Sequence, residues 1–275
     1  MLLTATFLML FYSGCSTRRL LYAIGETFIV HELDDTLELL PPQKDFLKQH
    51  LHAQFAWHRK EELPVYAQRL DELRQRFADG LSTDDVRWTR ATFEELFGRL
   101  ARHLAPDAGE FLATLEPSQV DHLERDIMKQ RKKRSDALDL PAEDYYVKRS
   151  GELKKTLVKW IGPLEPSQKA SIDAFVRHNR EDALIRRTVD QRHGQEFLTT
   201  LRGHLAAASI TERILARVTR DETDLSADEK AATDRLQAEM ERLALAIDQD
   251  ATPTQRKHLD AELASLHEDL VALSQ

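Results

Sequence analysis

The residues best suited to chemistry lie in two short stretches between positions 31 and 66. In the first, His31, Asp34 and Asp35 follow one another on a polar turn, and His31 and Asp35 have the i, i+4 spacing of metal ligands on a helix. A zinc-dependent hydrolase would need a second histidine at that position, and no third ligand follows. This stretch therefore favours an ordinary polar helix turn over a metal site.

The second stretch, Trp57 to Tyr66, combines aromatic and charged side chains with a proline. A proline kink beside Trp57 and Tyr66 would line a groove for an apolar or peptide ligand. Packing of the aromatic side chains is the alternative, and His58 and Glu61 also have metal-ligand spacing. We take Trp57, His58, Glu61 and Tyr66 as the candidate groove for a ligand or partner.

Signatures of common enzymes are missing from the chain. It has no Gly-rich phosphate loop, no G-x-S-x-G elbow and no S-x-x-K pair, and Cys15 is its one cysteine. We therefore assign no catalytic residue, no metal ligand and no cofactor, and favour a protein that is not an enzyme.

Cys15 ends an apolar run, Leu2 to Tyr12, through the small residues Ser13 and Gly14. The run is too short to span a bilayer, and the pattern resembles a bacterial lipoprotein signal peptide. This resemblance implies removal of residues 1–14, a lipid on Cys15 and, with Ser16 next, the periplasmic face of the outer membrane. The alternative is a free thiol beside a buried N-terminal helix.

Charge is distributed unevenly along the chain. The formal net charge is -8, which argues against a protein whose surface as a whole binds nucleic acid. Residues 125–159 hold eleven Lys/Arg and six Asp/Glu, whereas residues 221–275 hold five and fourteen. The basic part includes five cations between Met128 and Arg134, which suit a solvated helix face, anionic head groups or the chain's own acidic tail.

A pentapeptide, Leu-x-Pro-x-Gln, recurs at residues 39–43, 115–119 and 164–168, and in weaker form at 251–255. Proline suits the first helical position, and the glutamine two residues later reaches back to the cap. Ser82 and Ser226 mark two further starts.

Together with apolar periodicity, these signals predict an all-α fold, an irregular multi-helix bundle. The expected helices cover about 20–38, 42–79, 83–104, 117–135, 142–161, 166–207 and 211–220, with Pro64 kinking or splitting the second and Pro106 marking a connection.

Two leucine-rich stripes, residues 236–247 and 259–273, have heptad spacing on either side of a turn. They predict a C-terminal antiparallel helical hairpin that packs on the body or on a second chain. The expected organisation is a signal peptide at 1–14, a helical bundle at 15–220 and an acidic hairpin at 221–275.

Three segments carry a family resemblance: Leu33 to Gln43, Trp57 to Tyr66, and Trp160 to Gln168. On these the chain resembles an uncharacterised family of proteobacterial lipoproteins, defined as a domain of unknown function, over roughly residues 15–205. More weakly, the repeated pentapeptide resembles the LTxxQ motif of periplasmic chaperones.

The family resemblance implies a place in the envelope and no activity. We expect a non-enzymatic envelope lipoprotein that binds a partner protein or an unfolded client through helical surfaces. The alternatives are an enzyme acting on lipid or peptidoglycan, with a site assembled from distant helices, and a metal-binding envelope protein.

Overall fold

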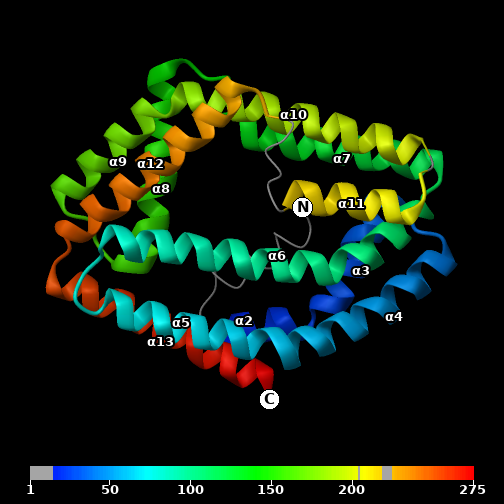
Figure 1. Ribbon diagram of the computed structural model, residues 1–275, viewed down its shortest axis with the longest axis horizontal. Helices are drawn as coiled ribbons and strands as arrows, with labels where there is room; N and C mark the ends of the chain where they lie inside the picture. Colours follow the sequence, from blue (N-terminus) through cyan, green and yellow to red (C-terminus); the bar gives the residue numbers. More distant parts are fainter. Residues whose placement is uncertain (1–14, 204, 219–224) are drawn as a thin grey trace.

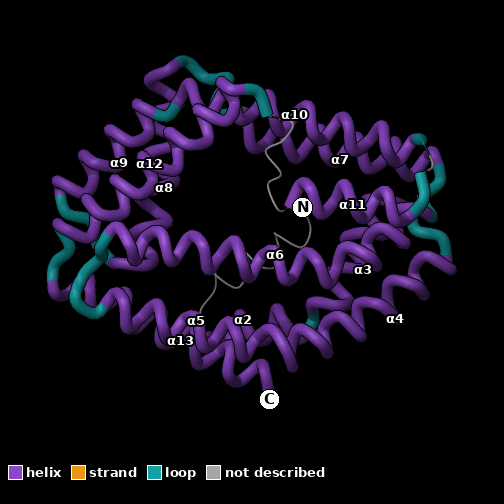
Figure 2. The backbone as a smooth tube through the Cα atoms, in the orientation of Figure 1, coloured by secondary structure: helices purple, strands orange, loops and turns teal. Residues whose placement is uncertain are grey.

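A computed structural model describes residues 15–203, 205–218 and 225–275 (Figure 1). The expected signal peptide, residues 1–14, lies outside the described residues. Figure 2 shows the described chain as helices joined by short loops, which confirms the all-α class. The helices are α2 (Cys15–Ala23), α3 (Gly25–Leu37), α4 (Pro41–Trp57), the π-helix η1 (His58–Glu62), α5 (Leu63–Phe77), α6 (Thr83–Ala113), α7 (Pro117–Ser135), α8 (Ala142–Ile161), α9 (Pro166–His178), α10 (Arg180–Arg202), α11 (Ala207–Val218), α12 (Ala227–Gln249) and α13 (Pro253–Ser274).

The helices form an elongated frame (Figure 1). Helices α4, α5 and α13 lie along one long edge, α7 and α10 along the other, and α6 and α11 between them. Helices α8, α9 and α12 form one end. No described helix has both the length and the apolar content needed to cross a membrane.

The core is divided among these layers. One cluster joins α3, α4, α6, α7, α10 and α11 around Leu37, Phe111 and Leu198, and a second joins α2, α5, α6 and α13 around Leu63 and Leu266. Two smaller clusters lie among α8, α9 and α12.

All four repeats of the pentapeptide begin a helix, as the sequence predicts. Pro41, Pro117, Pro166 and Pro253 are the first residues of α4, α7, α9 and α13. In each repeat the glutamine oxygen accepts a hydrogen bond from the backbone N–H of the cap residue, at 2.9–3.0 Å. The capping interaction expected from the sequence is therefore present four times.

The four glutamines also pair, which the sequence did not predict. Gln43 and Gln119 are buried and donate to each other's amide oxygen, at 2.9 and 2.8 Å. Gln168 and Gln255 do the same, at 3.1 and 2.9 Å. The second N–H of each amide goes to a backbone carbonyl across the junction, on Thr114, Leu37, Ile247 and Pro163 respectively.

We call these pairs the first and second glutamine hub. Each amide uses both donors, and each oxygen accepts twice, so the buried polar groups are satisfied. The first hub joins the α3–α4 connection to the α6–α7 connection, and the second joins α8–α9 to α12–α13. The repeats are thus tertiary junctions as well as helix starts.

The expected C-terminal hairpin needs correction. Helices α12 and α13 diverge from the turn at 250–252, with α12 lying along α9 and α10 and α13 along α5 (Figure 1). Each apolar stripe finds its partner in the body: Ile247 packs in a cluster with Ile172, and Leu266 in one with Leu63. Heptad spacing specifies an apolar face but not the helix that covers it.

Two boundaries also differ from the expectation, and a third agrees with it. Pro106 lies inside α6, which continues to Ala113 along α11, so the expected connection there was wrong. The single helix expected at 166–207 is divided at buried Asn179, whose side-chain amide donates to the carbonyl of Phe175 and competes with the helical bond. The expected interruption near Pro64 takes the form of the π-helix η1.

Candidate functional site

Helix η1 sets the geometry of the residues around Pro64. Proline has no N–H and its ring crowds the preceding turn, and a wider π-turn relieves that conflict. The backbone N–H of Leu63 bonds to the carbonyl of His58, five residues back. This extra residue in the turn brings Glu62 into the interior, where it is 1% exposed.

The buried carboxylate of Glu62 forms an ion pair with Arg99 of α6, whose side chain is 41% exposed. The guanidinium of Arg99 donates to its Oε1 at 2.7 Å, and this hydrogen bond raises the pKa of Arg99 above its ordinary value. The buried hydroxyl of Tyr66 lies beside the same carboxylate. Burial, followed by the charge of Glu62, raises the pKa of Tyr66 above its ordinary range, so the phenol stays protonated.

His58 completes this cluster on its other side. Its Nδ1 lies 3.0 Å from the hydroxyl of Tyr22 on α2, and its ring meets Tyr66 edge-on with centroids 5.4 Å apart. Burial lowers the pKa of His58 to about 4, against the opposing charge of Glu62, and burial raises the pKa of Tyr22 to about 12. Tyr22 therefore keeps its proton, and its hydroxyl is hydrogen-bonded to a neutral His58 ring.

The four residues of the predicted groove do not form one surface. His58 and Tyr66 meet in the interior, whereas Glu61 is exposed beside Lys60 at 3.9 Å. Trp57 lies flat on His103 of α6, with ring centroids 3.4 Å apart. The candidate groove did not include Glu62, and the signal that could have indicated its burial is Pro64, two residues later.

An apolar groove opens directly beside this cluster, between α5, α6 and α13. Its volume is about 80 Å³. It is lined by Tyr66, Arg69, Leu70, Leu73, Trp88, Thr89, Thr92, Phe93, Leu96, Leu266 and Leu270. Phe93 is 47% exposed, and the guanidinium of Arg76 lies 4.4 Å from the centre of the Trp88 ring.

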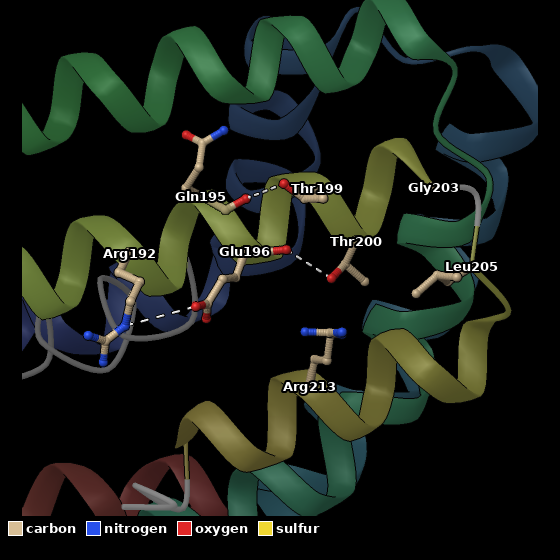
Figure 3. A pocket seen from close by; sticks show the side chains of 8 residues that line it. All are labelled: Arg192, Gln195, Glu196, Thr199, Thr200, Gly203, Leu205 and Arg213. Atoms are coloured by element: carbon tan, nitrogen blue, oxygen red, sulfur yellow. Dashed lines mark hydrogen bonds and ion pairs between the residues drawn. The ribbon is translucent and has the colours of Figure 1, made fainter. Parts of the chain in front are cut away.

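A larger and more open pocket of about 580 Å³ lies between α10 and α11 (Figure 3). Arg213 of α11 points across it toward α10. Arg192 on its wall is held by Glu229, at 2.6 Å, and the Thr200 hydroxyl donates to the carbonyl of Glu196. Most of its polar side chains are thus engaged with the chain itself.

The histidines and carboxylates that the sequence offered as candidates for chemistry lie apart from the linings of both pockets. His31 contacts Asp35 at 3.5 Å on an exposed face of α3, and Asp34 binds Lys44 and the backbone N–H of Leu39. Neither pocket is lined by His31, Asp34, Asp35, His58 or Glu61. Among the described residues, no three His, Cys, Asp or Glu side chains are grouped to hold a metal ion.

Comparison with known proteins gives a family and no relative of known activity. No curated protein and no solved structure shows a significant match to the chain. A family model described as a family of unknown function, DUF6279, matches residues 35–229. That range contains η1 and both partners of the first glutamine hub, but only Gln168 of the second. Since the match covers well over half of the sequence, the chain belongs to the DUF6279 family of unknown function.

Proposed function

We propose that this protein is a lipid-anchored, non-enzymatic binding protein of the bacterial cell envelope. Its binding site is the groove between α5, α6 and α13, and its ligand is an apolar segment of a partner protein. The observation that carries this proposal is the small, almost wholly apolar lining of the groove, open at Phe93 and Trp88.

The size of the groove selects the class of ligand. Sites for cofactors and small molecules usually enclose about 300–1,000 Å³. A volume of about 80 Å³ accommodates one or two apolar side chains instead. Such a pocket is typical of a protein interface, where one aromatic or aliphatic anchor supplies most of the binding energy.

The rim of the groove supports the same assignment. Arg69 pairs with Glu72 at 2.8 Å, and Arg76 with Asp85 at 3.0 Å, so apolar side chains are surrounded by paired charges. An apolar centre within a polar rim is the usual anatomy of a protein interface. Leu266 and Leu270 supply the floor from α13.

The proposed anchor is close to this floor in the fold. Cys15 begins α2, and Arg19 of α2 donates to Asp269 of α13 at 2.7 Å. Tyr22 belongs to the same core cluster as Leu266 and Leu270. A lipid on Cys15 would therefore hold the groove near the membrane; we assign it to the periplasmic face of the outer membrane.

Site-specific photocrosslinking in intact cells tests the binding site. A photoreactive residue replaces Phe93, and the control carries it at Val147 of α8, which is 74% exposed and distant in sequence from the groove. We expect a discrete adduct to one envelope protein at Phe93, and its loss when Leu270→Asp places a charge on the groove floor. Equal adducts at both positions, or none at Phe93, would reject the groove as the site.

Mass spectrometry of the mature N-terminus tests the anchor separately. Acylated Cys15 as the first residue is the expected result. An intact Met1 with a free thiol would reject the envelope assignment, whatever the crosslinking shows.

A further inference from the structure

Helix α7 carries the five cations that the sequence places between Met128 and Arg134, and one of them has a structural role. Arg131 points toward α10, where its guanidinium donates to the carbonyls of Asp190 and Gln191 at 3.0 and 3.4 Å. Gly194 leaves the room for it, because a Cβ there would lie 1.3 Å from Arg131 Nη2. This contact fixes the rotation of α7 about its axis.

With α7 held in this way, four of its other cations lie on the outside. Arg125, Lys129, Lys132 and Lys133 are exposed and follow helical spacing, so they share one face about 12 Å long. Met128, which is 62% exposed, lies among them. None of the four cations has a carboxylate partner among the residues the structure describes.

The acidic C-terminal part of the chain does not neutralise this face. None of its described carboxylates forms an ion pair with α7, and three of them pair with other helices: Glu229 with Arg192 of α10, Asp260 with Arg74 of α5, and Asp269 with Arg19 of α2. Of the three carboxylates of α7, Asp121 and Glu124 bind Arg202 of α10, and Asp126 accepts a hydrogen bond from the amide of Gln130 on α7 itself at 3.4 Å. Charge pairing within the described chain therefore leaves these four cations of α7 without an ion-pair partner.

We propose that this basic face of α7 docks on the surface of a bilayer that contains anionic phospholipid. Three of its four cations are lysines, which act as mobile point charges rather than as the planar forks that read phosphate or base geometry. Met128 supplies an apolar side chain at the level of the lipid head groups, and the face has no aromatic side chain on which a nucleic-acid base could stack. The choice of a bilayer rests on the proposed anchor, which would keep the chain at a membrane.

Vesicle co-sedimentation of an unacylated protein tests this without the anchor. The chain from Cys15 onward, with Cys15→Ser, contains all of the described residues. We expect it to bind vesicles of phosphatidylglycerol and phosphatidylcholine at low salt and not to bind pure phosphatidylcholine. Binding should disappear at about 1 M salt, where the Debye length falls to about 3 Å.

Two triple variants with equal net charge separate a local face from overall charge. K129Q/K132Q/K133Q removes three cations from α7, and K48Q/K169Q/K257Q removes three exposed lysines from α4, α9 and α13. Because each lysine near an anionic surface contributes about 1 kcal/mol, the first variant should bind on the order of 100-fold more weakly. The second should bind within about twofold of the parent, and circular dichroism should show both folded.

Absence of binding by the parent protein would overturn the proposal, as would equal losses in the two variants. Tight binding of single-stranded oligonucleotide without vesicle binding would overturn it in favour of another anion. Because this protein carries no lipid, failure here leaves the anchor to be decided by the mass of the mature N-terminus.

Discussion

Gln43 and Gln119 each donate a side-chain hydrogen bond to the other's amide oxygen, although 76 residues separate them. Each also accepts from the backbone at the start of its own helix. One side-chain type thus caps a helix and joins it to a distant helix. The same arrangement recurs between Gln168 and Gln255, 87 residues apart.

Replacing one glutamine of a hub should destabilise the fold strongly. Gln119→Leu removes one donor and one acceptor partner from the buried Gln43 amide and leaves the carbonyl of Leu37 and the N–H of Glu116 without their side-chain partner, so we expect the free energy of unfolding to fall by about 3 kcal/mol. Urea denaturation measures this. Exposed Gln75, which bonds to Asp71 within α5, supplies the control: Gln75→Leu should change stability by less than about 0.5 kcal/mol.

The same hub should show coupling between its two members. The double variant Gln43→Leu/Gln119→Leu removes both amides, so neither is left with an unpaired group facing the other. Its loss in the free energy of unfolding should therefore be at least about 1 kcal/mol smaller than the sum of the losses in the two single variants. Strictly additive costs would show that the two side chains act only as independent caps.

Removal of the Arg99 guanidinium should destabilise the fold because it leaves the carboxylate of Glu62 without a cation. Arg99→Met strands Glu62, which is 1% exposed, and should lower the free energy of unfolding by about 3 kcal/mol. Glu62→Gln/Arg99→Met removes both charges and should recover most of that loss. Arg90→Met on the exposed part of α6 is the control, and a similar small effect for Arg99→Met and Arg90→Met would contradict the dependence of the buried Glu62 carboxylate on Arg99.

His58 should make the fold acid-sensitive above the range in which carboxylates titrate. Its pKa falls from 6.5 to about 4 on burial, so the unfolded chain binds more protons between these values and acid favours unfolding. Between pH 7 and pH 5 the protein should lose about 2 kcal/mol that a His58→Gln variant does not lose. Above pH 7 the contribution of this histidine should be constant. Parallel stability curves for the two proteins would show that His58 is not held neutral.

Two helical glycines should respond to alanine in opposite directions. A Cβ on Gly109 would lie 2.1 Å from Thr211 Oγ1 and 2.8 Å from the carbonyl of Ala207, so Gly109→Ala should separate α6 from α11 and cost about 2 kcal/mol. A Cβ on Gly151, in the middle of α8, meets nothing within 4 Å, so Gly151→Ala should stabilise by about 0.5–1 kcal/mol. Thermal unfolding of the two variants measures both changes, and equal shifts in their melting temperatures would contradict close packing at Gly109.

The helix starts could be predicted because their signals are local. Ser82 and Asp85 form the expected capping box, as do Ser226 and Glu229, and the proline of each pentapeptide lies at the first helical position. Caps involve neighbouring residues in the chain, so no tertiary information is needed to recognise them. The pairing of the glutamines is different, because nothing in one repeat specifies which other repeat it meets.

The inner part of the candidate site could not be predicted for a related reason. Helical spacing from His58 draws attention equally to Glu61 and Glu62, and only the π-turn decides that Glu62 is buried. The partners of this segment, Tyr22 for His58 and Arg99 for Glu62, lie about 40 residues away on either side. Periodicity identifies faces of helices, whereas a site of this kind depends on which faces meet.

The second glutamine hub has a consequence for how the chain is made. Gln168 leaves the ribosome long before Gln255, and closing the intervening loop of 87 residues must precede any stabilisation that their pairing provides. Until α13 is synthesised, a nascent chain holds the α8–α9 junction with an unpaired amide and lacks the wall that α13 supplies to the groove. The groove can therefore be completed only after α13 has been synthesised, so a chain terminated before α13 would lack both the second glutamine hub and the floor of the groove.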